Sequence, residues 1–487
     1  MKMNYYLAID IGASSGRHIL GHVENGRMIL EEIYRFDNLQ IHKNGHDCWD
    51  IEHLFTNVKA GIAKCRELGK LPTTLGIDTW GVDYVLVDKS GTAICDAVAY
   101  RDKRTVGMRE KLEEIIPFET LYRKTGIQYQ PYNTIYQLFA HKLESPEDFE
   151  RAERFLMMPE YLGFLLTGVM KNEYTNASTT ALLSAERHVW DDELIEKLGI
   201  PRRIFGEPMP PMTTLGSFRP EVAEELGFDC TVILPATHDT GSAFMAVPAR
   251  DKTSVYISSG TWSLLGVEND KPLTGSNSMK ANFSNEGGFG YRFRYLKNIM
   301  GLWMIQSIRR ELNGQAYVQN KQRADAHAGE RKWSYAELEA AARENSDFAT
   351  VIDIDRESFL APDSMIDAVR AECERVGTEV PTEVGELMQC VYKSLADKYA
   401  RSVKELEALT GVKYTGIHIV GGGSKDGYLS ELTAAATGLP VYTGPAEGTA
   451  LGNLMAQFIK AGEFTDLEEA RSAIYDSFEI TEVNTKA

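Results

Sequence analysis

Three turns of small residues, each following an apolar stretch, are the first candidates for chemistry in this chain. They occupy residues 12–16, 258–261 and 421–424. The first turn is preceded by the acid Asp10 and followed by Arg17. Backbone amides in tight turns, an acid and a guanidinium together suit a metal-bound polyphosphate. A hairpin with polar caps would explain the first turn alone, so the phosphate hypothesis rests on the three turns together.

A second candidate is the stretch LPATHDTGSAF, in which an apolar segment ends at His238, Asp239 and Thr240. An acid at the end of a strand is well placed to accept the proton of a substrate hydroxyl. An ordinary Asp, with a pKa of about 4, is a weak base for an alcohol. Phosphoryl transfer tolerates a weak base because its loose transition state depends first on orientation. The alternative is structural, with Asp239 capping a helix and His238 hydrogen-bonded beside it.

Two further stretches mix aromatic rings with hydrogen-bonding side chains: DTWGVDYV, which starts at Asp78, and YRDKRT, which starts at Tyr100. This mixture suits sugars, whose faces are apolar and whose edges are polar. A cross-strand aromatic pair and a solvated charge cluster would explain the two stretches equally well. No G-x-x-x-x-G-K-[ST] loop and no H-E-x-x-H motif occurs, which argues against a P-loop nucleotide site and a zinc protease.

The elements that must position these residues alternate between strand and helix signals. The apolar run YYLAIDIG predicts a first strand, and further strands are expected at residues 18–23 and 28–34. Asn25-Gly26 between them is a strong signal for a two-residue hairpin turn. Asp50 is expected to cap the helix that follows, because apolar residues then recur at helical spacing.

The same order of elements returns near the middle of the chain. Residues 253–268 again predict a strand, a Ser/Gly turn and a strand, and a long amphipathic helix is expected around 384–409. Two halves that each open with a hairpin predict a duplicated α/β protein with a cleft between its domains. The divide is expected near residues 245–252. We therefore predict an N-terminal domain at 1–247 and a C-terminal domain at 248–487.

Composition excludes several classes of function. The chain has 487 residues, of which 43% are hydrophobic and 25% charged, as in ordinary globular proteins of more than one domain. Its net charge of −18 argues against binding to nucleic acid or to anionic membrane surfaces. Neither a signal peptide nor an apolar stretch of membrane-spanning length is apparent, and the scattered cysteines form no C-x-x-C pair. We expect a cytoplasmic protein, and the sequence leaves its oligomeric state open.

Several stretches together resemble the FGGY family of carbohydrate kinases. They include DIGASSGR, GIDTWGVDYVLVD, THDTGSAF, SSGTWSLLGVE, LKNIMGLW and IVGGGS, which follow one another over nearly the whole chain. The resemblance implies an α/β fold of two ribonuclease-H-like domains, as in the actin-like ATPases. It also implies that ATP and a ketose bind in the cleft between the domains.

The resemblance implies roles for individual residues. Asp239 would be the catalytic base, and Asp10 would help to hold Mg²⁺. The residues that would bind the sugar are Gly81, His238, Asp239, Thr240 and Asn298. The residues that would bind ATP are Ala13, Ser14, Ser15, Gly16, Arg17, Thr261, Gln306 and Gly422.

The resemblance also implies a reaction. DTWGVD, SSGTWSL and LKNIMGLW favour L-rhamnulose as the sugar, with ATP phosphorylating it to L-rhamnulose 1-phosphate in L-rhamnose catabolism. The alternatives are a kinase for another ketose, such as L-fuculose or xylulose, and a non-enzymatic, nucleotide-gated binding module. Many members of the family have Asn and Gln after the glycine turn, where this chain has Asp426 and Glu431. This difference bears on the contacts to the nucleotide.

Overall fold

The structure is a computed structural model that describes residues 3–315 and 327–484. Its contacts divide the chain into two compact units, each assembled from three segments. The first unit comprises Met1–Arg250, Val267–Leu296 and Glu447–Phe478. The second comprises Asp251–Gly266, Lys297–Ala446 and Glu479–Ala487. The domain boundary placed between residues 247 and 248 stays a prediction.

The first unit is built on a mixed sheet with the strand order β11-β12-β6-β1-β2-β3. Strands β12, β6 and β1 are parallel to one another, whereas β11, β2 and β3 join by antiparallel pairing. Asn25 and Gly26 both have positive φ, which is the geometry of a type I′ turn, and they connect β2 to β3 as predicted. In chain order the strands are β1 (Tyr5–Ile11), β2 (Ser15–Glu24), β3 (Arg27–Asp37), β6 (Pro72–Thr79), β11 (Thr213–Ser217) and β12 (Thr231–Leu234).

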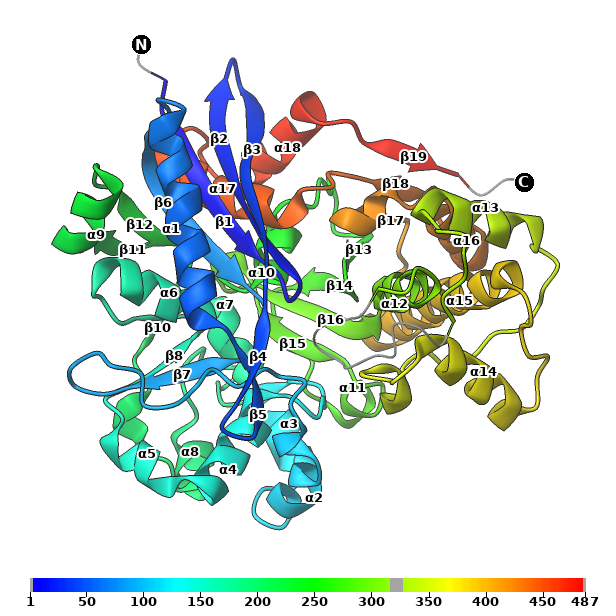
Figure 1. Ribbon diagram of the computed structural model, residues 1–487, viewed down its shortest axis with the longest axis horizontal. Coiled ribbons are helices and arrows are strands. Elements are labelled where there is room, and N and C mark those ends of the chain that lie inside the picture. Colours follow the sequence, from blue (N-terminus) through cyan, green and yellow to red (C-terminus); the bar gives the residue numbers. More distant parts are fainter. Residues whose placement is uncertain (1–2, 316–326, 485–487) are drawn as a thin grey trace. The chain divides into compact units, whose positions relative to one another are not determined.

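Helices cover the two faces of this sheet (Figure 1). Helix α1 (Ile51–Glu67) packs against β2 and β3, and Asp50 caps it by accepting a hydrogen bond from the amide of His53 at 3.0 Å. Helix α17 (Gly448–Ala461) packs against β1 and β6. Gly21 permits this approach, because a Cβ there would lie only 2.6 Å from Leu454 Cδ1. The predicted cap and helix after residue 50 are confirmed.

The remaining elements of the first unit contribute partly to the apolar core of the sheet and partly to a second apolar cluster. The strands are β4 (Gln40–Lys43), β5 (His46–Trp49), β7 (Tyr84–Val87), β8 (Arg154–Met157), β9 (Asn172–Glu173), β10 (Pro208–Met209) and β15 (Ser284–Gly287). The helices are α2 (Met108–Glu113), α3 (Phe118–Thr125), α4 (Thr134–Glu144), α5 (Pro146–Arg151), α6 (Met158–Thr167), α7 (Tyr174–Ala177), α8 (Asp192–Leu198), α9 (Pro220–Leu226), α10 (Asp239–Met245), α11 (Ser276–Lys280) and α18 (Leu467–Ser477). Trp190, in the second cluster, is fully buried.

In the second unit, strands neighbour one another in the order β14-β13-β17-β18-β19, which is part of a seven-stranded sheet. The strands of this unit are β13 (Ser254–Ser259), β17 (Gly416–Val420), β18 (Val441–Thr443) and β19 (Thr481–Val483). The boundary between the units falls within β14 (Trp262–Asn269) and within β16 (Phe293–Met300). The helices of the second unit are α12 (Trp303–Leu312), α13 (Tyr335–Glu344), α14 (Met365–Val376), α15 (Val384–Thr410) and α16 (Gly427–Thr437). The long helix expected around 384–409 is confirmed as α15.

Within the described residues, we find no helix that combines the length and the apolar character needed to cross a membrane.

Candidate active site

Parallel pairing brings the candidate acids to one edge of the first unit's sheet. Asp10 lies near the end of β1 and is the register partner of Asp78, near the end of β6. Thr79, the last residue of β6, forms a parallel bridge with His238, which follows β12. Asp239 then begins helix α10. Because the carboxyl ends of parallel strands meet at the same edge, three acids far apart in sequence come together there.

Arg17 is held by two acids. Its Nε and Nη2 donate to Asp10 Oδ2 at 2.9 and 2.8 Å, and its Nη1 donates to Glu447, which precedes α17. These ion pairs raise the pKa of Arg17 despite its burial, so the guanidinium stays charged. The turn between β1 and β2 therefore carries a fixed positive charge beside Asp10. Glu447 is a member of this cluster that the sequence analysis missed.

The turn itself is shorter than the sequence suggested. Only Gly12, Ala13 and Ser14 lie between the strands, because Ser15 and Gly16 already belong to β2. The amide of Gly12 donates to the carbonyl of Ser15 at 2.9 Å, which closes the turn. The side chains at its tip are half-buried.

Asp78 is the most deeply buried of the acids, with no exposed surface. Its Oδ2 accepts a hydrogen bond from Asn453 at 2.6 Å, whereas its Oδ1 is buried with no hydrogen-bond partner among the described residues. Burial and the charge of Asp10 raise the pKa of Asp78 well above its usual range. A buried carboxylate oxygen left open beside a second carboxylate is suited to a proton or to a cation.

Asp239 has the environment of a proton acceptor. Its side chain is 29% exposed, and its Oδ1 accepts from the amide of Thr240 at 2.6 Å. Burial, with the charge of Asp10, raises the pKa of Asp239 above its ordinary value, although His238 and Thr240 oppose the shift. The helix cap at this point is His238 and not Asp239, so the proposed capping role of Asp239 is wrong.

A close helix contact fixes the position of Asp239. Helix α10 packs on α17 at Gly452, where a Cβ would lie 1.8 Å from the carbonyl oxygen of Ser242. On the strand side, a Cβ at Gly81 would lie 3.2 Å from His238 Nε2. Glycines thus admit the α10 backbone on one side and the His238 ring on the other. Gly81, His238, Asp239 and Thr240, all predicted sugar-binding residues, lie in the first unit.

A buried pair of glutamates lies behind this segment, and the sequence analysis missed it. The hydroxyl of Thr237 is 2.9 Å from Glu160 Oε1 and 2.8 Å from Glu173 Oε2. One hydroxyl proton serves only one of them, so one of the two carboxyl groups must hold a proton. Burial, with the charge of Glu173, raises the pKa of Glu160 to about 8, which identifies Glu160 as the protonated partner.

The aromatic stretches form an internal network. Asp83 Oδ2 accepts from the indole nitrogens of Trp49 and Trp80 at 2.7 and 2.9 Å and from the amide of Tyr100 at 3.1 Å. Asp83 Oδ1 accepts from Gln137 at 2.9 Å. Burial nevertheless raises the pKa of Asp83 to about 6. This network anchors the segment that carries Gly81.

Three predicted nucleotide-binding residues lie near one another in the second unit. Thr261 follows β13, and its carbonyl accepts from the amide of Trp303, in the same helix as Gln306. Gly422 lies in the turn after β17, where the preceding Gly421 has positive φ and a Cβ would lie 2.8 Å from the Ser259 carbonyl oxygen. This close packing keeps the two turns adjacent. Asn298, predicted to bind sugar, is half-buried on β16 in this unit.

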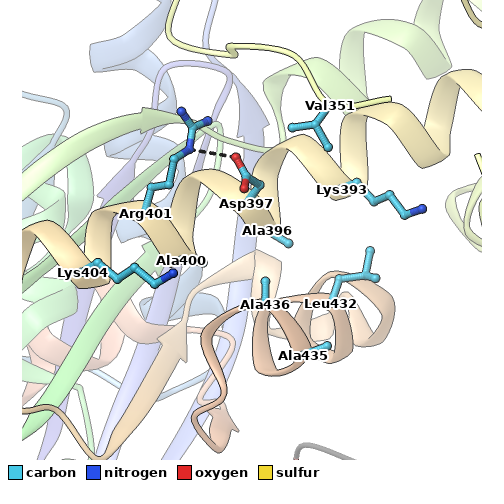
Figure 2. A pocket seen from close by; sticks show the side chains of 10 residues that line it. All are labelled: Val351, Lys393, Ala396, Asp397, Ala400, Arg401, Lys404, Leu432, Ala435 and Ala436. Carbon is cyan, nitrogen blue, oxygen red and sulfur yellow. Dashed lines mark ion pairs between the residues drawn. The ribbon is translucent and has the colours of Figure 1, made fainter. Parts of the chain in front are cut away.

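A surface pocket of the second unit lies elsewhere, between α15 and α16 (Figure 2). Alanines of both helices line it, and the side chains of Lys393 and Lys404 extend from α15 beside them. Asp397 pairs with Arg401 at 2.8 Å. Its lining includes none of the nucleotide-binding residues predicted from the sequence.

Comparison with protein-family models shows to which family the chain belongs. Residues 5–246 match the N-terminal domain, and residues 255–461 the C-terminal domain, of the FGGY family of carbohydrate kinases. The chain belongs to this family. The resemblance noted in the motifs is therefore confirmed.

Several named kinases are similar to the chain over nearly its whole length. A protein named rhamnulokinase from Halalkalibacterium halodurans is 46% identical over 478 residues, covering 98% of each chain. One of the same name from Bacillus subtilis is 40% identical over 476 residues, covering 98% of this chain and 94% of its own. Among solved structures, gluconate kinase from Lactobacillus acidophilus has a TM-score of 0.79 at 17% identity, covering 100% of this chain and 94% of its own. Plasmodium falciparum glycerol kinase with ADP has a TM-score of 0.76 at 15% identity, covering 99% and 95%.

These similarities confirm the predicted fold, an α/β protein of two domains of the actin-like ATPase type. The two departures from the FGGY pattern have structural partners here. Asp426 caps α16 by accepting from the amide of Leu429 and also accepts from the Tyr392 hydroxyl, each at 3.0 Å. Glu431 forms a two-point ion pair with Arg343 at 2.7 and 3.0 Å.

Proposed function

We propose that this protein phosphorylates L-rhamnulose, producing L-rhamnulose 1-phosphate and ADP from ATP. The observation that carries the proposal is the full-length similarity to proteins named rhamnulokinase. It is supported by Asp239, an acid whose pKa is raised and which lies beside two further carboxylates. The alternative substrates are L-fuculose and xylulose, and the test below distinguishes them from L-rhamnulose.

The chemistry assigned to the chain's residues is an in-line transfer. The 1-hydroxyl oxygen of the sugar bonds to the γ-phosphorus, the bond from that phosphorus to the bridging oxygen breaks, and ADP leaves. Asp239 takes the hydroxyl proton, and its raised pKa brings it nearer to that of an effective base. Gly81, His238, Thr240 and Asn298 bind the sugar in this proposal.

We assign the phosphates to the turn after β1. The residues assigned to them are Ala13, Ser14, Ser15 and Gly16, and Arg17 supplies a positive charge held in place by Asp10 and Glu447. Thr261, Gln306 and Gly422 are assigned to the nucleotide. These groups orient the phosphates and neutralise their charge, which are the main requirements of phosphoryl transfer.

Mg²⁺ is the metal expected with ATP. The described residues contain no group of three or more His, Cys, Asp or Glu side chains suited to a metal, but Mg²⁺ is usually held by one or two carboxylates together with phosphates and water. Asp10 and the open Oδ1 of Asp78 fit that requirement. Mg²⁺ bound there would neutralise charge on the phosphates. We also propose a cytoplasmic location, where ATP is available.

The first test is ADP release by the purified protein with Mg²⁺-ATP, measured with L-rhamnulose, L-fuculose, L-xylulose, glycerol or no sugar. The proposal predicts strong stimulation by L-rhamnulose, with ³¹P and ¹³C NMR placing the new ester at C1. Preference for another ketose would replace the substrate but keep the kinase. ATP turnover indifferent to every sugar would reject the kinase and favour a nucleotide-gated binding module.

A further inference from the structure

The two ring nitrogens of His238 face different partners. Nε2 lies 3.4 Å from Asp239 Oδ1. On the other side of the ring, Nδ1 lies 3.0 Å from Arg294 Nη2 and 3.3 Å from Glu286 Oε2. The imidazole therefore stands between the candidate base and a buried arginine–glutamate pair. Neither Glu286 nor Arg294 was among the residues predicted to form the site.

Glu286 and Arg294 form a pair across two strands of the first unit. They are register partners on β15 and β16, and Arg294 Nη1 lies 3.2 Å from Glu286 Oε2. The Arg294 side chain is fully buried, and that of Glu286 is 6% exposed. Arg294 Nε donates to the carbonyl of Gly287 at 2.8 Å, and its guanidinium lies 5.9 Å from the centre of the Phe244 ring in α10. This contact network fixes the guanidinium against the helix that carries Asp239.

The position of Arg294 determines which nitrogen of His238 holds the proton. A guanidinium has donors and no acceptor, so the contact at 3.0 Å requires Nδ1 to be an acceptor. A neutral imidazole that accepts at Nδ1 carries its proton on Nε2. Nε2–H then points toward Asp239 and Gly81.

Glu286 favours the other tautomer of His238, with the proton on Nδ1. Burial would favour its neutral form, but Arg294, His238 and Ser284 together outweigh burial and lower the pKa of Glu286, so the carboxylate is charged. It balances the buried guanidinium. It also lies 3.3 Å from Nδ1, where it would accept a proton if Arg294 were absent. Arg294 and Glu286 thus favour opposite tautomers, and the shorter contact belongs to Arg294.

We propose that Arg294, balanced by Glu286, is a positioning residue that holds His238 as its Nε2–H tautomer, so that the ring donates toward Asp239 and the sugar. The catalytic part of this inference rests on the proposed kinase function, whereas the tautomer itself does not. A purely structural ion pair between β15 and β16 would stabilise the fold without determining the tautomer.

The direct test is ¹⁵N NMR of the histidine rings in the wild-type protein, because protonated and unprotonated ring nitrogens resonate far apart. The chain has ten histidines, so His238→Gln identifies the signal. The proposal predicts a neutral ring with the proton on Nε2. A proton on Nδ1 in the wild-type protein would overturn it, whether or not any sugar is phosphorylated.

Variants of Arg294 and Glu286 then test whether Arg294 determines the tautomer of His238. In Arg294→Met, the proton is expected to move to Nδ1, facing Glu286, and kcat/KM for the sugar to fall roughly 10- to 100-fold. Adding Glu286→Gln restores an amide donor beside Nδ1, so the double variant is expected to regain the Nε2–H tautomer and part of the activity. Loss of packing alone would not be repaired by this second change. An unchanged tautomer in Arg294→Met would reject the proposal.

Arg471→Met is the matched control. Arg471 is also a buried arginine, paired with Glu268 at 2.9 Å, and it donates to the carbonyls of Phe244 and Met245 at the far end of α10. The control is expected to lose stability but to keep the His238 tautomer. If Arg294→Met does not fold, Arg294→Lys, which keeps a donor, is expected to retain the Nε2–H signal, and a Nδ1–H signal there would count against the proposal. Failure of the wild-type protein on every sugar would reject the kinase function alone.

Discussion

Asp10 and Asp78 are register partners on the parallel strands β1 and β6, so two carboxyl groups face one another in a buried place. Such an arrangement is unfavourable for two charges, and the pKa of Asp78 is raised accordingly by burial and by Asp10. Asn453 offsets part of this penalty by donating to Asp78 Oδ2 at 2.6 Å. The protein thus retains a strained pair where a cation would relieve the repulsion.

Asp78→Asn is therefore expected to stabilise the fold and to impair activity. When the pKa of an acid is higher in the folded state than in the unfolded state, the protein loses stability as pH rises from the ordinary pKa to the raised pKa. Over that range the unfolded state releases the proton and the folded state keeps it. The amide removes this loss, so Tm at pH 8 should rise by roughly 2–4 °C. The Mg²⁺ concentration for half-maximal activity should increase about 10-fold or more.

The control for this change is Glu225→Gln, which removes a charge from an exposed acid paired with Lys59. It should alter neither the Mg²⁺ requirement nor Tm by a comparable amount. An Asp78→Asn enzyme with an unchanged Mg²⁺ requirement would contradict the assignment of Asp78 to the metal.

Asp239→Asn tests the proposed base. Loss of the Asp239 carboxylate should lower kcat about 10²- to 10⁴-fold, which is the usual contribution of a positioned proton acceptor. Nucleotide binding, measured by calorimetry, should change little. In the wild-type protein the acidic limb of kcat/KM should lie above pH 4, because the pKa of Asp239 is raised.

Asp192→Asn is a matched control for the base, since Asp192 is 75% exposed and pairs with Arg202. It should retain wild-type kcat. Substantial turnover by Asp239→Asn would mean that another group accepts the proton.

Glu160→Gln tests the buried glutamate pair. The pKa of Glu160 is raised to about 8, so between its ordinary pKa and pH 8 the native state holds a proton that the unfolded state releases. Wild-type stability should fall as pH rises toward 8 and level off above it. In thermal unfolding between pH 6 and 9, the Tm of Glu160→Gln should increase relative to that of the wild type up to about pH 8. Parallel curves would show that Glu160 is not the protonated member.

Gly452→Ala tests the contact that seats α10. The new Cβ would collide with the Ser242 carbonyl oxygen, at 1.8 Å in the present geometry. Overpacking of this kind costs about 1–3 kcal/mol, which urea unfolding can measure. Because α10 carries Asp239, kcat should fall with stability. Gly275→Ala, where a Cβ would meet no atom within 4 Å, should change both far less.

Local sequence determined much of the architecture. The Asn25-Gly26 hairpin, the Asp50 cap and the helix α15 follow from turn chemistry and hydrophobic periodicity, which operate over a few residues. The family motifs likewise sufficed for the two-domain fold and for the candidates Asp10 and Asp239. The hairpin, the cap and the helix depend on neighbours in the chain, and for that reason the sequence alone predicts them.

Tertiary structure alone decided the partners of those residues. Parallel pairing of β1 with β6 places Asp78 beside Asp10, and the cross-strand pair of Glu286 and Arg294 reaches His238. Glu447 reaches Arg17 from a segment 430 residues away in the sequence. Periodicity and motif spacing carry no information on such contacts, because the contacts depend on strand order, register and burial. The same burial shifts the pKa values on which the proposed chemistry depends.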